Sequence, residues 1–145
     1  MNIRTVEKKI YNIKNVIFCT LTFFLLGTFT ELYLINHYTD IFQIIPIVCI
    51  GFSFFSFLVL IYKVTRLSLK LFKFSLLTTS LIGLLGVFFH LNSNYEFEKE
   101  MKPSGESWGL FVESLSGALP ALAPLNLVIL SMVGYSYILI LKQNQ

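Results

Sequence analysis

The sequence predicts an all-α, polytopic membrane protein built as a four-transmembrane-helix bundle. Of its 145 residues, 55% are hydrophobic and only 13% are charged, whereas ordinary globular domains carry about 25% charged residues. Four apolar runs each reach the roughly 20 residues that a helix needs to cross a bilayer. These runs do not alternate apolar with polar residues, as strands of a membrane barrel would. The composition excludes disordered and nucleic-acid-binding classes.

The four runs define the predicted spans in chain order. They cover residues 16–35, 41–62, 71–91 and 118–141. The first run follows a basic segment, but it is longer than the 7 to 15 residues of a signal-peptide core, so we expect it to remain as a helix. The outer loop 92–117 is too short for a separate soluble domain. We therefore expect a single membrane domain over residues 1–145.

Basic residues predict how the chain is oriented. Nine of the eleven Lys and Arg residues precede the first run, connect the second and third runs, or follow the fourth. Cytoplasmic flanks are enriched in Lys and Arg, so we expect a plasma (inner) membrane protein with both termini in the cytoplasm. Seven of the eight acidic residues fall on the opposite side. The loop 92–117 is then an acidic extracytoplasmic surface that attracts cations.

Glu31 is the acidic residue that lies inside an apolar run. A carboxylate at that depth costs free energy unless it is paired or hydrated, and such residues often mark a partner or a pathway. His37 follows in the next connection, and His90 ends the third run. If that helix continues, His90 and Asn94 share a face, with Glu96 close behind. We therefore predict a polar cluster of Glu31, His37, His90, Asn94 and Glu96.

This predicted cluster allows three interpretations. Imidazole and carboxylate groups are suitable ligands for a divalent transition metal. The same groups could pass protons, because histidine titrates near neutral pH. Alternatively, they form a structural hydrogen-bond network between helix ends. No short motif such as His-Glu-x-x-His is present, so the sequence leaves the three open.

A short helix is expected before the fourth span. Leu110, Phe111 and Leu115 form a helical stripe, and Trp108 is the kind of anchor that interfacial helices use. A short re-entrant turn is the alternative interpretation. The sequence therefore predicts that this segment lies in the outer membrane interface.

Small residues and prolines mark the start of the fourth span. Gly117 and Ala121 have the four-residue spacing that lets helices approach closely. Pro120 is expected in the first helical turn, where its missing N–H is harmless. Pro124 is expected to kink the helix.

The favoured function is that of a non-catalytic accessory subunit or structural bundle. The chain has no inverted repeat, no polar stripe along a span and no nucleophile or cofactor motif, which argues against transporters and channels. The alternative is a metal-binding protein or a membrane enzyme that uses the Glu/His cluster at the outer ends of the first and third helices. Expected partners are the lipid bilayer and either another membrane protein or a second copy, and no nucleic acid.

Overall fold

The structure, a computed structural model, describes the backbone of residues 3–143 and the side chains of residues 10–142. This part of the chain forms five helices and no strand. The helices are α1 (Ile3–Leu34), α2 (Ile41–Tyr62), α3 (Arg66–Met101), α4 (Ser107–Ser114) and α5 (Leu125–Gln143). Four of them, α1, α2, α3 and α5, are long and apolar enough to cross a membrane. The predicted all-α class with four candidate spans is confirmed.

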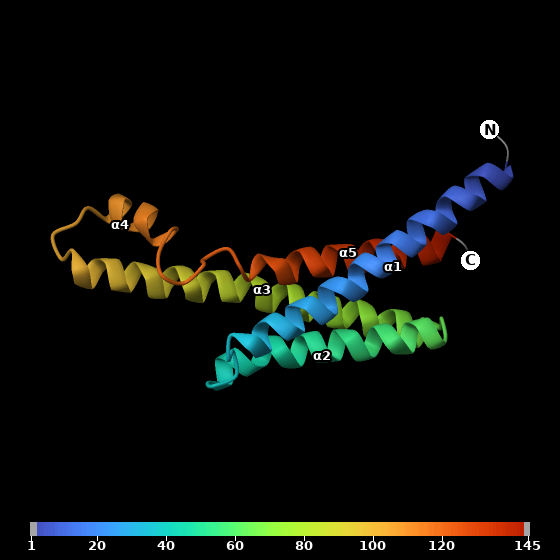
Figure 1. Cartoon of the computed structure of the whole chain (residues 1–145), viewed down its shortest axis with the longest axis horizontal. Helices are drawn as coiled ribbons and strands as arrows, with labels where there is room; N and C mark the ends of the chain where they lie inside the picture. Colours follow the sequence, from blue (N-terminus) through green and yellow to red (C-terminus); the bar gives the residue numbers. More distant parts are fainter. Residues whose placement is uncertain (1–2, 144–145) are drawn as a thin grey trace.

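Helix α3 lies at the centre of the arrangement. It contacts α2, α4 and α5, whereas α1 packs against α2 and α5 and has no contact with α3 among the described residues. The start of α1, the end of α5 and the α2–α3 connection lie on the same side of the molecule, at what we call the terminal end (Figure 1). The α1–α2 connection and α4 lie at the opposite, distal end (Figure 1).

The helix boundaries agree with the sequence only in part. The predicted span 41–62 coincides with α2, but α3 covers 66–101 instead of 71–91 and α1 begins well before residue 16. The predicted outer loop 92–117 contains the last ten residues of α3, which extend that helix beyond the predicted span, and α4, the short helix expected there. Hydropathy marks only the part of a helix that lies in lipid. Glu and Lys are good helix formers, so polar residues continue α3 beyond its apolar part.

The α1–α2 connection is short and has a defined conformation. Asn36 adopts the left-handed conformation, with φ of 56°, and the N–H of His37 donates to the carbonyl of Leu32 at 2.9 Å. This hydrogen bond is the Schellman arrangement that ends many helices. Asp40 then starts α2, because its carboxylate accepts from the N–H of Phe42 at 2.8 Å. These two caps fix His37 between the helices.

Two hydroxyl pairs join α2 to α3. Ser53 and Thr79 lie 2.9 Å apart, and Ser56 and Ser75 lie 2.8 Å apart, measured between their hydroxyl oxygens. All four side chains are buried, and polar contacts of this kind hold helices together where lipid supplies no hydrophobic drive. The connection 63–65 is only three residues long, so α2 and α3 form a tight antiparallel pair.

An aromatic cluster brings all four long helices together. The ring of Phe57 on α2 has its centroid 5.6 Å from Phe18 on α1, 5.4 Å from Phe72 on α3 and 5.5 Å from Tyr137 on α5. Phe57 is 1% exposed. Aromatic pairs at such separations each contribute about 0.5 to 1.5 kcal/mol beyond the area they bury. The cluster is therefore a main contact between the four helices.

Helices α3 and α5 approach closely at two glycines. A Cβ atom on Gly83 would lie 2.9 Å from the carbonyl oxygen of Pro124, and one on Gly86 would lie 2.8 Å from the Cβ of Pro124. The start of α5 thus packs directly on the backbone of α3. Glycine is required wherever two backbones come this close.

The predicted start of the fourth span at residue 118 is wrong. Helix α5 begins at Leu125, so Pro120 does not occupy a first helical turn and Pro124 does not kink the helix. Gly117 and Ala121 also precede α5, in a segment of turns. Each proline lacks an N–H and disfavours the helical conformation in the residue before it. Two prolines four residues apart therefore delay the helix until after Pro124.

Candidate functional site

Asn94 connects the distal part of α3 to the segment that leads into α5. Its amide nitrogen donates to the carbonyl of Ser114 at 2.9 Å and to that of Leu119 at 2.7 Å. Its amide oxygen accepts from the N–H of Leu119 at 3.0 Å. Asn94 is only 3% exposed, and buried amides need such partners. The side chain therefore holds the backbone of residues 114–119 against α3.

His37 and His90 belong to the same region of the bundle, where Phe42 on α2 and Phe89 on α3 have ring centroids 6.0 Å apart. His90 places Nδ1 3.1 Å from the carbonyl oxygen of Pro120, and with the proton on Nδ1 it donates to that oxygen. Partial burial lowers the pKa of His37, and the nearby charge of protonated His90 lowers that pKa further. Both effects disfavour the imidazolium form. His37 therefore favours its neutral ring.

Glu31 and Glu96 do not join the histidines. The carboxylate of Glu96 accepts from Asn92 at 2.9 Å, one turn away along α3, and this contact is exposed. Glu31 is exposed on α1, and no ion pair or side-chain hydrogen bond involves it among the residues the structure describes. Because α1 and α3 are not neighbours, Glu31 and His90 have no packed face in common.

A metal ligand set is not assembled at the predicted cluster. Among the side chains of residues 10–142, no group of three or more His, Cys, Asp or Glu is arranged to hold a metal ion. Structural and catalytic zinc sites use at least three protein ligands. The structure joins both His90 and Asn94 to the chain before α5. It does not bring Glu31 or Glu96 to them.

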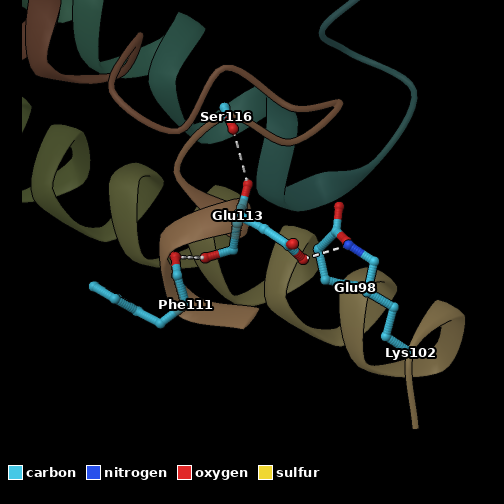
Figure 2. Close-up of polar contacts among 6 residues, drawn as sticks. Glu98, Lys102, Phe111, Glu113 and Ser116 are labelled. Carbon is cyan, nitrogen blue, oxygen red and sulfur yellow. Dashed lines mark hydrogen bonds and ion pairs between the residues drawn. The ribbon is translucent and has the colours of Figure 1, made fainter. Parts of the chain in front are cut away.

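The segment from Asn92 to Ser114 folds into what we call the distal hairpin. It comprises the last turns of α3, the turn 102–106, and α4, which lies beside α3 (Figure 1). Figure 2 shows Lys102 reaching from the end of α3 to Glu113 on α4, with its Nζ 2.6 Å from a carboxylate oxygen. The hydrogen bond with Glu113 raises the pKa of Lys102. The pair is exposed to water, so it orients the hairpin more than it stabilises it.

The distal hairpin exposes apolar side chains. Trp108 and Phe111 stack with ring centroids 5.6 Å apart, and Trp108 is 69% exposed. Val112 and Leu115 are also exposed beside them. The surrounding segment 92–117 carries five glutamates and two lysines. The helix expected from the sequence at this point is present as α4, and the structure adds that it packs on α3.

The structure shows a groove on α1 that the sequence did not predict. Its lining residues belong to α1, apart from Ile35 just after the helix end, and include Cys19, Phe23, Gly27 and Glu31, which are spaced four apart. This spacing was visible in the sequence. The spacing alone does not predict a groove, however, because lipid-facing and protein-facing residues of a membrane helix are both apolar.

Comparison of this chain with protein-family models, curated proteins and solved structures finds no match. Its function is therefore argued from the geometry of its own residues.

Proposed function

We propose that this chain is a non-catalytic accessory subunit of a membrane-protein complex and that the distal hairpin is a surface it presents to a partner. The proposal rests on one observation. The polar side chains Asn94 and His90 at the distal end make hydrogen bonds with main-chain groups. Asn94 binds carbonyls and an N–H in residues 114–119, and His90 contacts the carbonyl of Pro120. Side chains engaged in this way build a rigid scaffold.

The length of α3 supports this role. Its 36 residues correspond to about 54 Å of helix, compared with about 30 Å of hydrocarbon in a bilayer. The last ten residues, 92–101, therefore extend about 15 Å beyond the lipid core. With α4 packed on it, α3 presents Trp108 and Phe111 near the outer edge of the lipid core, since Phe111 lines a pocket with Phe88, Leu91, Asn92 and Tyr95 at the end of the apolar run. Exposed aromatic residues of this kind are typical anchors of protein interfaces.

The orientation is part of the same proposal. The terminal end lies in the cytoplasm and the distal hairpin on the outer side of the plasma (inner) membrane, because nine of eleven Lys and Arg residues flank the terminal end of the spans. The test uses single cysteines in a chain carrying Cys19→Ser and Cys49→Ser. We expect Ser104→Cys to react with a membrane-impermeant maleimide in intact cells, and Val64→Cys to react only after lysis. The reverse pattern would refute the orientation.

The accessory role is tested on native gels after extraction with a mild detergent. We expect the wild-type chain to migrate in a complex larger than its own mass, and the double variant Trp108→Ser/Phe111→Ser to migrate outside that complex. Tyr62→Ser is the matched control, because Tyr62 is 92% exposed at the terminal end. A wild-type chain that migrates alone, or a double variant that stays in the complex, contradicts the proposal.

A further inference from the structure

The exposed face of α1 forms a groove with the shape of a helix-packing surface. Its volume is about 760 Å³, and its ten lining residues form two parallel rows with a spacing of four residues. One row runs from Phe18 to Leu34 and the other from Cys19 to Ile35. Rows at this spacing are the ridges between which a second helix inserts its own side chains. No other helix of the described chain lines the groove.

Gly27 lies within the second row. A Cβ atom on Gly27 would meet no other atom within 4 Å, so packing inside this chain does not require glycine there. Gly83, Gly86, Gly117 and Gly134, by contrast, each have neighbours within 3 Å of such an atom. Glycine on an exposed membrane-helix face lets an incoming helix approach closely. Gly27 therefore fits packing against a helix from outside the chain.

Glu31 supplies a charge at the distal end of the groove. It lies three residues before the end of α1, about 4.5 Å along the axis, and its carboxylate has no ion pair within the described residues. A carboxylate at the edge of the hydrocarbon is stabilised by a cationic partner. The groove therefore favours a helix that carries a positive charge near its distal end.

A second copy of this chain does not supply that charge. Between Lys14 and Lys63 the sequence has no Lys or Arg, and two copies inserted in the same direction would bring Glu31 level with Glu31. The two basic residues at the distal end, Lys99 and Lys102, lie eight or more residues beyond the apolar run, about 12 Å along the axis of α3, and Lys102 is already paired with Glu98 and Glu113. Like charges at one level oppose a symmetric contact through this face.

We propose that the α1 groove binds a membrane-spanning helix of another protein that carries a lysine or arginine in its distal third. This inference rests on the proposed accessory role and names the partner's chemistry at a second surface of the subunit. Glu31 pairs with the basic side chain, and Gly27 provides the close approach. The rows of α1 provide the remaining apolar contacts.

The test measures energy transfer between the labelled, purified chain and synthetic helices in lipid vesicles. One probe is an apolar 22-residue peptide with a lysine one turn inside each end, so that its direction of insertion does not matter. The other probe has leucine at both positions. We expect the lysine peptide to associate with the wild-type chain about fivefold or more tightly than the leucine peptide.

Two variants and one control keep the result interpretable. Glu31→Gln should remove the preference for lysine, and Gly27→Ile should weaken both peptides. Gly51→Ile should change neither, because a Cβ at Gly51 also meets nothing within 4 Å. Equal association of the two peptides, or a lysine preference that survives Glu31→Gln, overturns the inference. Tighter self-association that Gly27→Ile abolishes would identify a second copy as the occupant and would also overturn it.

The outcome is separable from that of the accessory role. The peptide experiment uses the isolated chain and tests the α1 groove, whereas the native gels test the distal hairpin in complexes extracted from the natural membrane. A complex on native gels together with no lysine preference rejects the groove partner alone. A lysine preference without a native complex rejects the hairpin role alone.

Discussion

Asn94 occupies the space that a side chain at Gly117 would need. A Cβ atom built on Gly117 would lie 2.5 Å from Asn94 Cγ and 2.7 Å from Asn94 Nδ2. The same amide makes three hydrogen bonds with Ser114 and Leu119, on either side of this glycine. The distal hairpin thus depends on one buried amide and on the absence of one methyl group.

We expect Gly117→Ala to destabilise the protein by about 1 to 3 kcal/mol, because the added methyl group displaces Asn94 from its backbone partners. Thermal unfolding in detergent, followed by circular dichroism, measures the change. Gly109→Ala is the matched control, since a Cβ there meets nothing within 4 Å and alanine favours the helix by about 0.5 to 1 kcal/mol. Equal effects of the two substitutions would contradict this account.

The contact between Gly83 and Pro124 gives a second expectation. Gly83→Ala should lower the stability of the chain by about 1 to 3 kcal/mol, because its methyl group would lie 2.9 Å from a backbone oxygen that cannot easily move. Gly51→Ala, in α2, should leave stability unchanged or slightly raised. The free energy of unfolding in mixed detergent micelles is the relevant measurement. An unaffected Gly83→Ala variant would mean that α3 and α5 are further apart.

The hydroxyl pair of Ser56 and Ser75 should show coupling between α2 and α3. Each hydroxyl also lies within hydrogen-bonding distance of a carbonyl of its own helix. Because each has one proton, one hydroxyl donates to its carbonyl while the other donates across the pair, so only the double-mutant cycle isolates the contact between them. For alanine substitutions we expect a coupling of about 0.6 kcal/mol, the average for such bonds in membranes. Ser136→Ala, on the exposed face of α5, should contribute nothing to the cycle. A coupling indistinguishable from zero would argue against the pair.

His37 should titrate below the ordinary histidine pKa of about 6.5. Burial and the charge of His90 both disfavour its protonated form, so the unfolded chain binds this proton more readily than the folded chain. The resulting stability is present above about pH 6.5 and is lost as the pH falls through the lowered pKa. Ring-proton NMR measures the titration, and His90→Gln should move the pKa of His37 upward. A pKa of His37 at or above 6.5 would contradict the arrangement.

The sequence predicted the four long apolar helices better than it predicted where they begin and end. The α2 boundaries 41–62 followed directly from hydropathy, because Asp40 caps one end and the basic connection marks the other. Hydropathy could not predict the extension of α3 to Met101, since a helix in water needs no apolar composition. Nor could it predict that the prolines at 120 and 124 stay outside α5.

The predicted polar cluster depended on which helices are neighbours. The sequence predicts Glu31 and His90 at a similar level along their helices. Among the described residues, however, α1 packs on α2 and α5 and not on α3. Spans of similar hydropathy do not encode this order, because residues facing lipid and residues facing protein look alike in sequence. Asn94 was recognised as polar and correctly placed on the face of His90. Its partners lie on backbone, which leaves no trace in residue identity.

The continuous helix α3 also sets the direction in which the distal hairpin faces. Each residue inserted into α3 beyond the apolar part would raise the hairpin by about 1.5 Å and turn it by about 100° around the helix axis. Inserting seven residues would restore its facing to within about 20° while raising it by about 10 Å. The height of the hairpin and the direction in which it faces can therefore be varied separately. Binding measurements on such insertions distinguish a partner that requires one of the two from a partner that requires both.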